Sequence, residues 1–265
     1  AYHLLPISAQ CLWFILPASR VGEQRMQDFV GVKGVLSPER LQELSQRSDW
    51  PALVQLASHW GALAASSWGL SIFWGTWWSL PLFVLQGVLL NFLYAPTHEC
   101  DHLTAFKSRW LNIWVARICG FVIFNPSDHH RWTHFAHHRN TQNWEKDTEL
   151  ERPPFRTATQ YLFALSGLPL IRFKLARIWR HAFVSPQEWY LSPRQQRQVQ
   201  SAARWHIAGY ALALASAVMF GSWWVLYFWW GPFSLMRWSY MLQGPVSYTH
   251  LRAHETEADL VCRLL

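Results

Sequence analysis

The chain has 265 residues, of which 51% are hydrophobic and only 15% are charged. A soluble domain carries about 25% charged residues, so this composition argues against an ordinary soluble protein. The net charge of +7 is compatible with nucleic-acid binding, but no basic run is combined with a recognition motif, and nucleic acid is not an expected partner. Membrane topology explains the charge better, because Lys and Arg collect in cytoplasmic loops.

The first 35 residues are predicted to lie outside the main domain. No Met occurs before Met26, so the residues before it are interpreted as part of a signal sequence or as sequence upstream of the native start. A polar amphipathic helix is predicted from Ser37 to Arg47, with Ser37 as the N-cap and Pro38 at the first helical position.

Four apolar segments form two pairs, and each pair is predicted to be a membrane-spanning helical hairpin. The first pair covers 52–74 and 77–96, and the second covers 203–220 and 223 to about 241. Each segment is long enough to cross a bilayer at about 1.5 Å per residue. Only Gly75-Thr76 and Gly221-Ser222 separate the partners. The predicted fold is therefore an all-α integral membrane domain over residues 36–244.

Positive charge is unevenly distributed along the chain. Arg40 and Arg47 precede the first hairpin, the central segment holds most of the remaining Lys and Arg, and both hairpin tips are uncharged. This pattern predicts that the N-terminus, the central segment and the C-terminal end are cytoplasmic. Within the central segment, 110–124 is predicted to be interfacial or re-entrant, and 161–180 a basic helix on the lipid headgroups.

Histidines are concentrated in the central segment. His98 and His102 are four residues apart, and His134, His137 and His138 have offsets of three and four, so each group shares one side of a helix. Such a concentration beside apolar segments would be costly unless the rings bind a metal or form hydrogen bonds. Imidazole binds iron, zinc, copper and nickel alike, so the ligand type does not select the metal. Three isolated histidines are interpreted as hydrogen-bonded interior groups: His59, His181 and His206.

The sequence from His98 to His102 also matches H-E-x-x-H, in which Glu99 would be the general base of a zinc protease. A protease needs one further ligand, and a single tetrahedral zinc would leave most of the second histidine group unused. The two groups together favour a site with several histidines and two metal ions. An intramembrane zinc protease and a non-catalytic metal carrier are the alternatives of a different class.

The residues around both histidine groups resemble the membrane fatty acid desaturase superfamily, which includes related hydroxylases and carotenoid-modifying enzymes. The resemblance covers about 36–244 and rests on Thr97-His-Glu-x-x-His102, Thr104-Ala-Phe106, Ser108-Arg109, Leu111-Asn112, Arg131-x-x-His134-Phe-Ala-His137-His138-Arg139, Thr141-Gln142 and Asp147-x-Glu-Leu150. It implies O2-dependent desaturation of a fatty acyl chain at a centre of two Fe ions. It also implies a separate electron donor of the ferredoxin or cytochrome b5 type. Hydroxylation of an alkyl or carotenoid chain is the alternative on the same fold.

By position, the resemblance assigns five iron ligands: His98, His102, His134, His137 and His138. His130 is a candidate extra ligand or a hydrogen-bonding neighbour of the ligands. Four carboxylates are candidates for orienting imidazole N–H groups: Glu99, Asp101, Asp128 and Asp147.

The superfamily has a third histidine box after the second hairpin, and here the sequence departs from that pattern. The Trp-rich composition ends after Gly244, and residues 245–265 are predicted to be a non-native tail. His250 and His254 in this tail are not expected to be ligands. Five or six histidines do not complete a di-iron shell, so the chain as printed is expected to lack part of the centre.

Overall fold

The computed structural model describes residues 37, 39–40, 43, 46–150 and 157–241. Within these ranges the regular elements are helices, and they include no strand. The chain divides into one unit over residues 1–47 and a second over residues 48–265. Residues 1–35 and the predicted tail lie outside the described residues. The all-α prediction is confirmed for the part that is described.

In the first unit, Ser37 caps the start of the predicted polar helix. Ser37 Oγ accepts a hydrogen bond from the backbone N–H of Arg40 at 3.2 Å, which is the contact expected of an N-cap serine. The backbone N–H of Gln46 donates to the Glu43 carbonyl at 3.2 Å, and residues 46–48 are not helical. The predicted helix therefore does not extend to Arg47.

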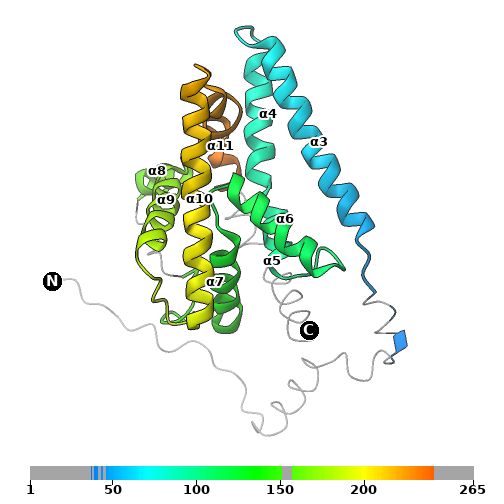
Figure 1. The fold of residues 1–265 in the computed structure, drawn as a ribbon, viewed down its shortest axis with the longest axis vertical. Coiled ribbons are helices and arrows are strands. Elements are labelled where there is room, and N and C mark those ends of the chain that lie inside the picture. The colour runs from blue at the N-terminus through cyan, green and yellow to red at the C-terminus, as the bar shows by residue number, and fades with distance from the viewer. Residues whose placement is uncertain (1–36, 38, 41–42, 44–45, 151–156, 242–265) are drawn as a thin grey trace, which may run out of the picture. The chain divides into compact units, whose positions relative to one another are not determined.

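The first predicted hairpin is present as two packed antiparallel helices, α3 (Trp50–Phe73) and α4 (Ser79–Phe92) (Figure 1). Gly75 at the tip has a φ of 79°, a left-handed conformation that glycine adopts without strain. His59 Nε2 contacts the Leu89 carbonyl at 2.9 Å and so joins the two helices. The interpretation of His59 as a hydrogen-bonded group is confirmed.

Helix α4 is followed almost directly by α5 (Tyr94–Asp101), with Leu93 between them. The Leu93 backbone N–H donates to the Leu90 carbonyl at 3.3 Å, a tightened turn at this junction. Together the two helices cover Ser79–Asp101, which among the described helices is the one long and apolar enough to cross a membrane. The other three predicted spans do not meet this criterion, and the four-span topology stays a prediction.

Helix α6 (Arg109–Val122) occupies the central segment predicted to be interfacial. Its buried face includes Asn112 and Ala116, whereas its opposite face exposes Trp110 and Trp114 one turn apart. At its C-terminal end, carbonyls of the last turn accept hydrogen bonds from side chains. The Tyr210 hydroxyl donates to the carbonyl of Phe121 at 2.9 Å, and Trp229 Nε1 donates to that of Val122 at 2.7 Å. These two contacts attach α6 to the C-terminal part of the chain.

The predicted basic helix over 161–180 is instead two helices, α8 (Ala158–Leu165) and α9 (Leu168–Phe183). Gly167 separates them with a φ of 72°, which helical backbone does not adopt. A Cβ atom at Gly167 would overlap the Arg237 side chain. The prediction of one continuous helix was wrong because the chain turns at this glycine to pass Arg237.

Helix α10 (Pro193–Met219) begins with a capping box between Ser192 and Gln195, and it includes nearly all of the predicted span over 203–220. Gly221 follows with a φ of 55°, so the predicted turn is present. His206 Nδ1 contacts the Ala202 carbonyl at 2.8 Å, but its buried Nε2 has no hydrogen-bond partner, so the prediction of a hydrogen-bonded interior group is confirmed for one ring nitrogen only.

The return segment predicted as one helix over 223–241 is broken into three short pieces. They are a π-helix (Val225–Trp230), α11 (Gly231–Leu235) and α12 (Arg237–Met241). Pro232 has no backbone N–H and cannot bond to the carbonyl of Phe228 four residues earlier. Gln86 Nε2 of α4 donates to that carbonyl instead, at 2.9 Å. The prediction of one regular helix was wrong in two places: the backbone changes from π to α geometry just before Pro232, and Met236 interrupts the helix.

The core beneath the histidine-bearing helices is apolar and aromatic. Phe124 stacks on Trp229 with ring centres 5.9 Å apart, and Phe121 stacks on Tyr210 at 4.8 Å. Phe233 of α11 packs against Phe124 at 5.3 Å. These contacts fix the segment between α6 and α7 (Ser127–Asn140), and α7 carries the second histidine group.

Candidate metal centre

The two histidine groups predicted from the sequence lie together in the structure, and we name these five residues the primary cluster. His98 lies in α5 and His102 directly after it, whereas His134, His137 and His138 lie in α7, which contacts α5. The ring centre of His98 is 4.5 Å from that of His134, and the ring centre of His102 is 4.9 Å from that of His138. Folding thus brings the two groups into one cluster.

Three imidazole nitrogens converge on a small volume. His134 Nε2 lies 3.0 Å from His102 Nε2 and 2.9 Å from His138 Nε2. On the far side of the His134 ring, Nδ1 lies 3.1 Å from Glu149 Oε1. A carboxylate accepts, so Nδ1 carries the proton and Nε2 has one lone pair. That lone pair cannot serve two hydrogen bonds well, whereas a metal ion among the three nitrogens could bind them all, so this donor set fits a metal ion.

His137 is oriented by a buried carboxylate, Asp147. Its Nδ1 donates to Asp147 Oδ1 at 2.6 Å, and Asp147 is only 3% exposed. Asp147 also accepts hydrogen bonds from the backbone N–H groups of Gln142 at 2.8 Å and Glu149 at 2.9 Å. A carboxylate held in this way fixes the tautomer and ring orientation of a metal-binding histidine.

His130 is held by a second buried carboxylate. Its Nδ1 donates to Asp101 Oδ2 at 2.6 Å, and Asp101 is fully buried. Its Nε2 lies 3.2 Å from the Tyr94 hydroxyl, which is then the donor. The His130 ring stacks on the His134 ring with centres 5.5 Å apart. In this arrangement the His130 lone pair is directed at Tyr94 rather than into the primary cluster.

The other two predicted carboxylates lie in different surroundings. Glu99 Oε1 accepts from His98 Nδ1 at 3.1 Å, and its side chain is 59% exposed. Asp128 accepts two hydrogen bonds from the Arg117 guanidinium, both at 3.0 Å. Three of the four predicted carboxylates therefore contact an imidazole of this region, whereas the described hydrogen bonds of Asp128 are with Arg117.

Burial keeps two of the three converging imidazoles neutral. Burial, together with the neighbouring His98 and His138 rings, lowers the pKa of His102 to about 4. Burial lowers the pKa of His134 to about 3, although its hydrogen bond to Glu149 acts in the opposite direction. Both rings are therefore neutral at pH 7, which is the protonation state that binds a metal.

Two contacting residues were not among the site residues proposed from the sequence. Glu149 Oε2 lies 3.7 Å from His137 Nε2, in addition to the contact of Oε1 with His134. Burial raises the pKa of Glu149, but the His134 hydrogen bond and the nearby imidazoles outweigh it and lower the pKa. The sequence signal for Glu149 was its place in Asp147-x-Glu-Leu150. Tyr94 had a signal too, because it lies one helical turn before His98.

The family comparison agrees with this geometry. The family model described as "Fatty acid desaturase" matches residues 74–258, which include both histidine groups and more than half of the chain. The chain belongs to the fatty acid desaturase family.

The similar proteins include two lipid desaturases of cyanobacteria and a plant fatty acid desaturase. The sn-1 acyl-lipid omega-3 desaturase (ferredoxin) of Synechocystis sp. is 33% identical over 32% of this chain and 24% of its own length. The sn-1 oleoyl-lipid 12-desaturase of Picosynechococcus sp. is 31% identical over 58% of this chain and 46% of its own length. The Delta(12) fatty acid desaturase FAD2 of Calendula officinalis is 23% identical over 67% of this chain and 50% of its own length. The chain thus spans half or less of these relatives, and no solved structure matches it.

Proposed function

We propose that this chain provides iron ligands of a membrane fatty acid desaturase, through His98, His102, His134, His137 and His138. The observation that carries the proposal is the convergence of the His102, His134 and His138 Nε2 atoms to within about 3 Å. Two bound iron ions would supply the redox chemistry by which O2 accepts electrons from an acyl C–H pair and from a donor protein. The roles of the protein are to hold the imidazoles neutral and oriented and to position the chain.

The proposed orientation of the ligands depends on the carboxylates behind them. Asp147 accepts a hydrogen bond from His137 Nδ1, and Glu149 accepts one from His134 Nδ1. This arrangement directs the remaining nitrogen of each ring away from the carboxylate and raises its basicity as a ligand. Asp101 accepts a hydrogen bond from His130 Nδ1 in the same way. Because His130 Nε2 contacts Tyr94, we propose that His130 lies beside the metal centre and is not a ligand.

The proposed membrane arrangement has four spans in two hairpins with the primary cluster on the cytoplasmic side. It is supported by the apolar length of Ser79–Asp101 and by apolar side chains on helix faces that no other described element covers. Trp110 and Trp114 of α6 are 63% and 54% exposed. Exposed aromatic side chains of this kind suit the membrane interface.

The proposed acyl-chain site is an apolar cavity of about 410 Å³ between the two hairpins. It is lined by Trp60, Ser67, Leu90, Phe121, Val122, Trp224, Phe228 and Trp229. Leu90 lies eight residues before His98, about 12 Å along a helix. An apolar cavity at this separation is suited to an alkyl chain that ends near the metal.

The proposed electron donor is a separate ferredoxin-type protein. The Synechocystis relative carries ferredoxin in its name. A cytochrome b5-type donor is the other candidate of the same class.

Metal content and product mass test the proposal together. The chain purified in detergent after growth with iron is expected to contain iron, and His102→Ala is expected to lose most of it. The longest natural protein that contains this chain is then supplied with a lipid substrate, reduced ferredoxin and O2. A product two hydrogens lighter supports desaturation, whereas a gain of one oxygen indicates hydroxylation. If the purified chain binds zinc but no iron, and the longer protein consumes no oxygen, the proposal is contradicted.

A further inference from the structure

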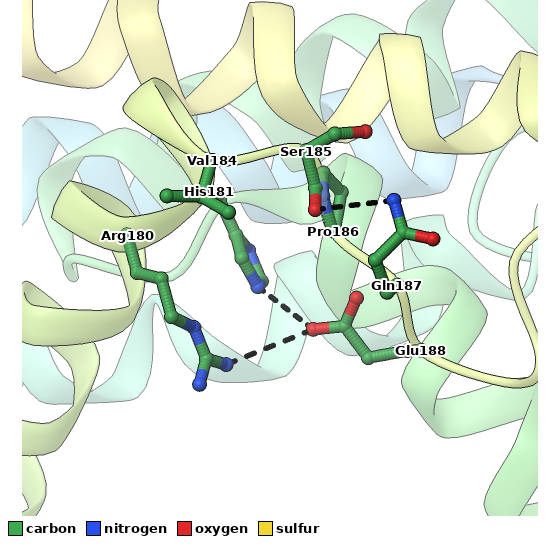
Figure 2. A pocket seen from close by; sticks show the side chains of 7 residues that line it. All are labelled: Arg180, His181, Val184, Ser185, Pro186, Gln187 and Glu188. Atoms are coloured by element: carbon green, nitrogen blue, oxygen red, sulfur yellow. Dashed lines mark hydrogen bonds and ion pairs between the residues drawn. The ribbon is translucent and has the colours of Figure 1, made fainter.

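A second group of metal-ligand side chains lies outside the primary cluster, and we name it the second cluster. His129 of α7, His181 of α9 and Glu188 of the connection from α9 to α10 each place one ligand atom within 4.8 Å of the others. His129 and His181 are each 3% exposed. Figure 2 shows His181 and Glu188 directed toward each other at a pocket of about 320 Å³.

We propose that His129, His181 and Glu188 bind a divalent transition-metal ion, zinc by preference. Zinc bonds of about 2.0 to 2.1 Å in tetrahedral geometry place ligand atoms about 3.3 to 3.4 Å apart. Glu188 Oε1 lies 2.8 Å from His181 Nε2 and 3.9 Å from His129 Nε2. These two nitrogen-to-oxygen distances lie on either side of the required value, each within about 0.6 Å of it, and all three ligand atoms lie within 4.8 Å of one another.

The protonation and packing of the three residues suit metal binding. Burial, with a smaller effect of the Arg177 cation, lowers the pKa of His129 well below its usual range, so the ring is neutral. Glu188 Oε2 is buried and has no hydrogen-bond partner. A buried carboxylate oxygen of this kind is costly unless it binds something. The Tyr190 hydroxyl, 3.3 Å from His129 Nε2, is near enough to supply or orient the fourth ligand.

The donor set suits a transition-metal ion. Two imidazoles and one carboxylate with an open fourth position are a known zinc ligand set. The same three ligands also bind Fe²⁺ in some enzymes, so the test below measures zinc and iron together. The Arg180 guanidinium lies 3.8 Å from Glu188 Oε1 and its side chain is 65% exposed. This positive charge opposes a second cation, so Arg180 should limit the affinity.

The second cluster is separate from the primary cluster. His129 lies nine residues before His138, and nine steps of about 100° turn half a circle around α7. A bound ion would join α7 to α9 and to the connection that carries Glu188. It would hold α7 from the side opposite His138. This proposal does not depend on the proposed desaturase function.

Zinc stoichiometry is the direct test. The full chain in detergent is stripped of metal, equilibrated with zinc chloride, desalted and analysed by mass spectrometry for zinc and iron. Glu188→Gln keeps the size of the side chain but removes its charge, and it should lose one zinc per chain. His181→Gln should do the same. His206→Gln is the matched control, a buried histidine outside both clusters, and it should bind as much zinc as the wild type. Equal zinc in the wild type and Glu188→Gln would overturn the proposal.

Arg180→Gln gives a test that does not depend on removing a ligand. If the cluster binds zinc, removal of the nearby cation should tighten zinc binding several-fold, measured by competition with a chelating dye. If the three residues form only a hydrogen-bonded ion pair, zinc binding should be unchanged. His134→Ala should leave this affinity intact, which separates the result from the primary cluster.

Discussion

The primary cluster and the second cluster both include histidines of α7, but the carboxylates have different roles in the two clusters. In the primary cluster, Asp147 and Glu149 contact the Nδ1 atoms of His137 and His134 and leave other ring nitrogens to converge. In the second cluster, Glu188 is itself one of the converging groups, with His181 Nε2 at 2.8 Å. The first arrangement suits a centre with several nitrogen ligands, and the second suits one ion that joins separate elements.

The carboxylates of the primary cluster form a graded series. The side chain of Asp147 is 1% exposed, that of Glu149 is 37% exposed and that of Glu99 is 59% exposed. Solvent screens the interaction of an exposed charge with its partner, and a buried charge is screened much less. The contribution of each carboxylate to metal binding should therefore follow its burial, and the variants below test that order.

The largest effect is expected for His134→Ala. This ring lies at the centre of the three converging nitrogens, so its loss removes a ligand and also leaves Glu149 without its hydrogen bond. We expect iron affinity to fall more than the roughly 100-fold that loss of an orienting partner causes. Bound iron per chain measures the effect, with His206→Gln as the control. Full iron content in His134→Ala would remove this residue from the ligand set.

Asp147→Asn should have the next largest effect. Asparagine can keep one backbone contact, but its neutral oxygen is a weaker acceptor for His137 Nδ1, which donates to Asp147 at 2.6 Å. A loss of about 10 to 100-fold in iron affinity is expected. Asp128→Asn is the matched control because Asp128 bonds to Arg117, and its iron affinity should stay within about twofold of the wild type.

Local spacing predicted the parts of this molecule that local contacts determine. The hairpin tips at Gly75 and Gly221 and the shared faces of the primary-cluster histidines follow from short-range pattern, and they are present. Beside Pro232, the Phe228 carbonyl instead accepts a hydrogen bond from Gln86, which lies 142 residues away. The residue pattern of one segment does not indicate a hydrogen-bond partner that lies in another segment.

The same limit applies to the sites. Glu149 lies 15 residues from His134, across the end of α7, so no helical register indicated their contact. His181 was expected to be a satisfied interior group, and its hydrogen bond to Glu188 agrees with that. Its proximity to His129, with ring centres 4.8 Å apart, depends on the packing of α9 beside α7. Isolated residues that folding brings together carry no spacing signal of their own.

Glu149→Gln should have an intermediate effect. Glutamine keeps an oxygen that can accept from His134 Nδ1, and the carboxylate it replaces is partly exposed. We expect a loss of about 10-fold in iron affinity, the lower end of the range for an orienting partner. Titration of the metal-free chain with Fe²⁺ under anaerobic conditions measures it. A loss as large as that of His134→Ala would instead make Glu149 a direct ligand.

The smallest effect on metal binding is expected for Glu99→Gln. The Glu99 carboxylate is the most exposed of the series, and its described contacts include His98 Nδ1 at 3.1 Å. Iron affinity, and the proposed desaturation by the longer natural protein, should fall by less than about tenfold, because solvent screens this exposed carboxylate and water can replace it as the partner of His98. In a zinc protease, Glu99 would be the general base, and the same change would abolish activity while leaving metal binding intact. Bound metal and product formation measured side by side therefore separate the two mechanisms: parallel small losses support the oxidoreductase, and lost activity with full metal content supports the protease.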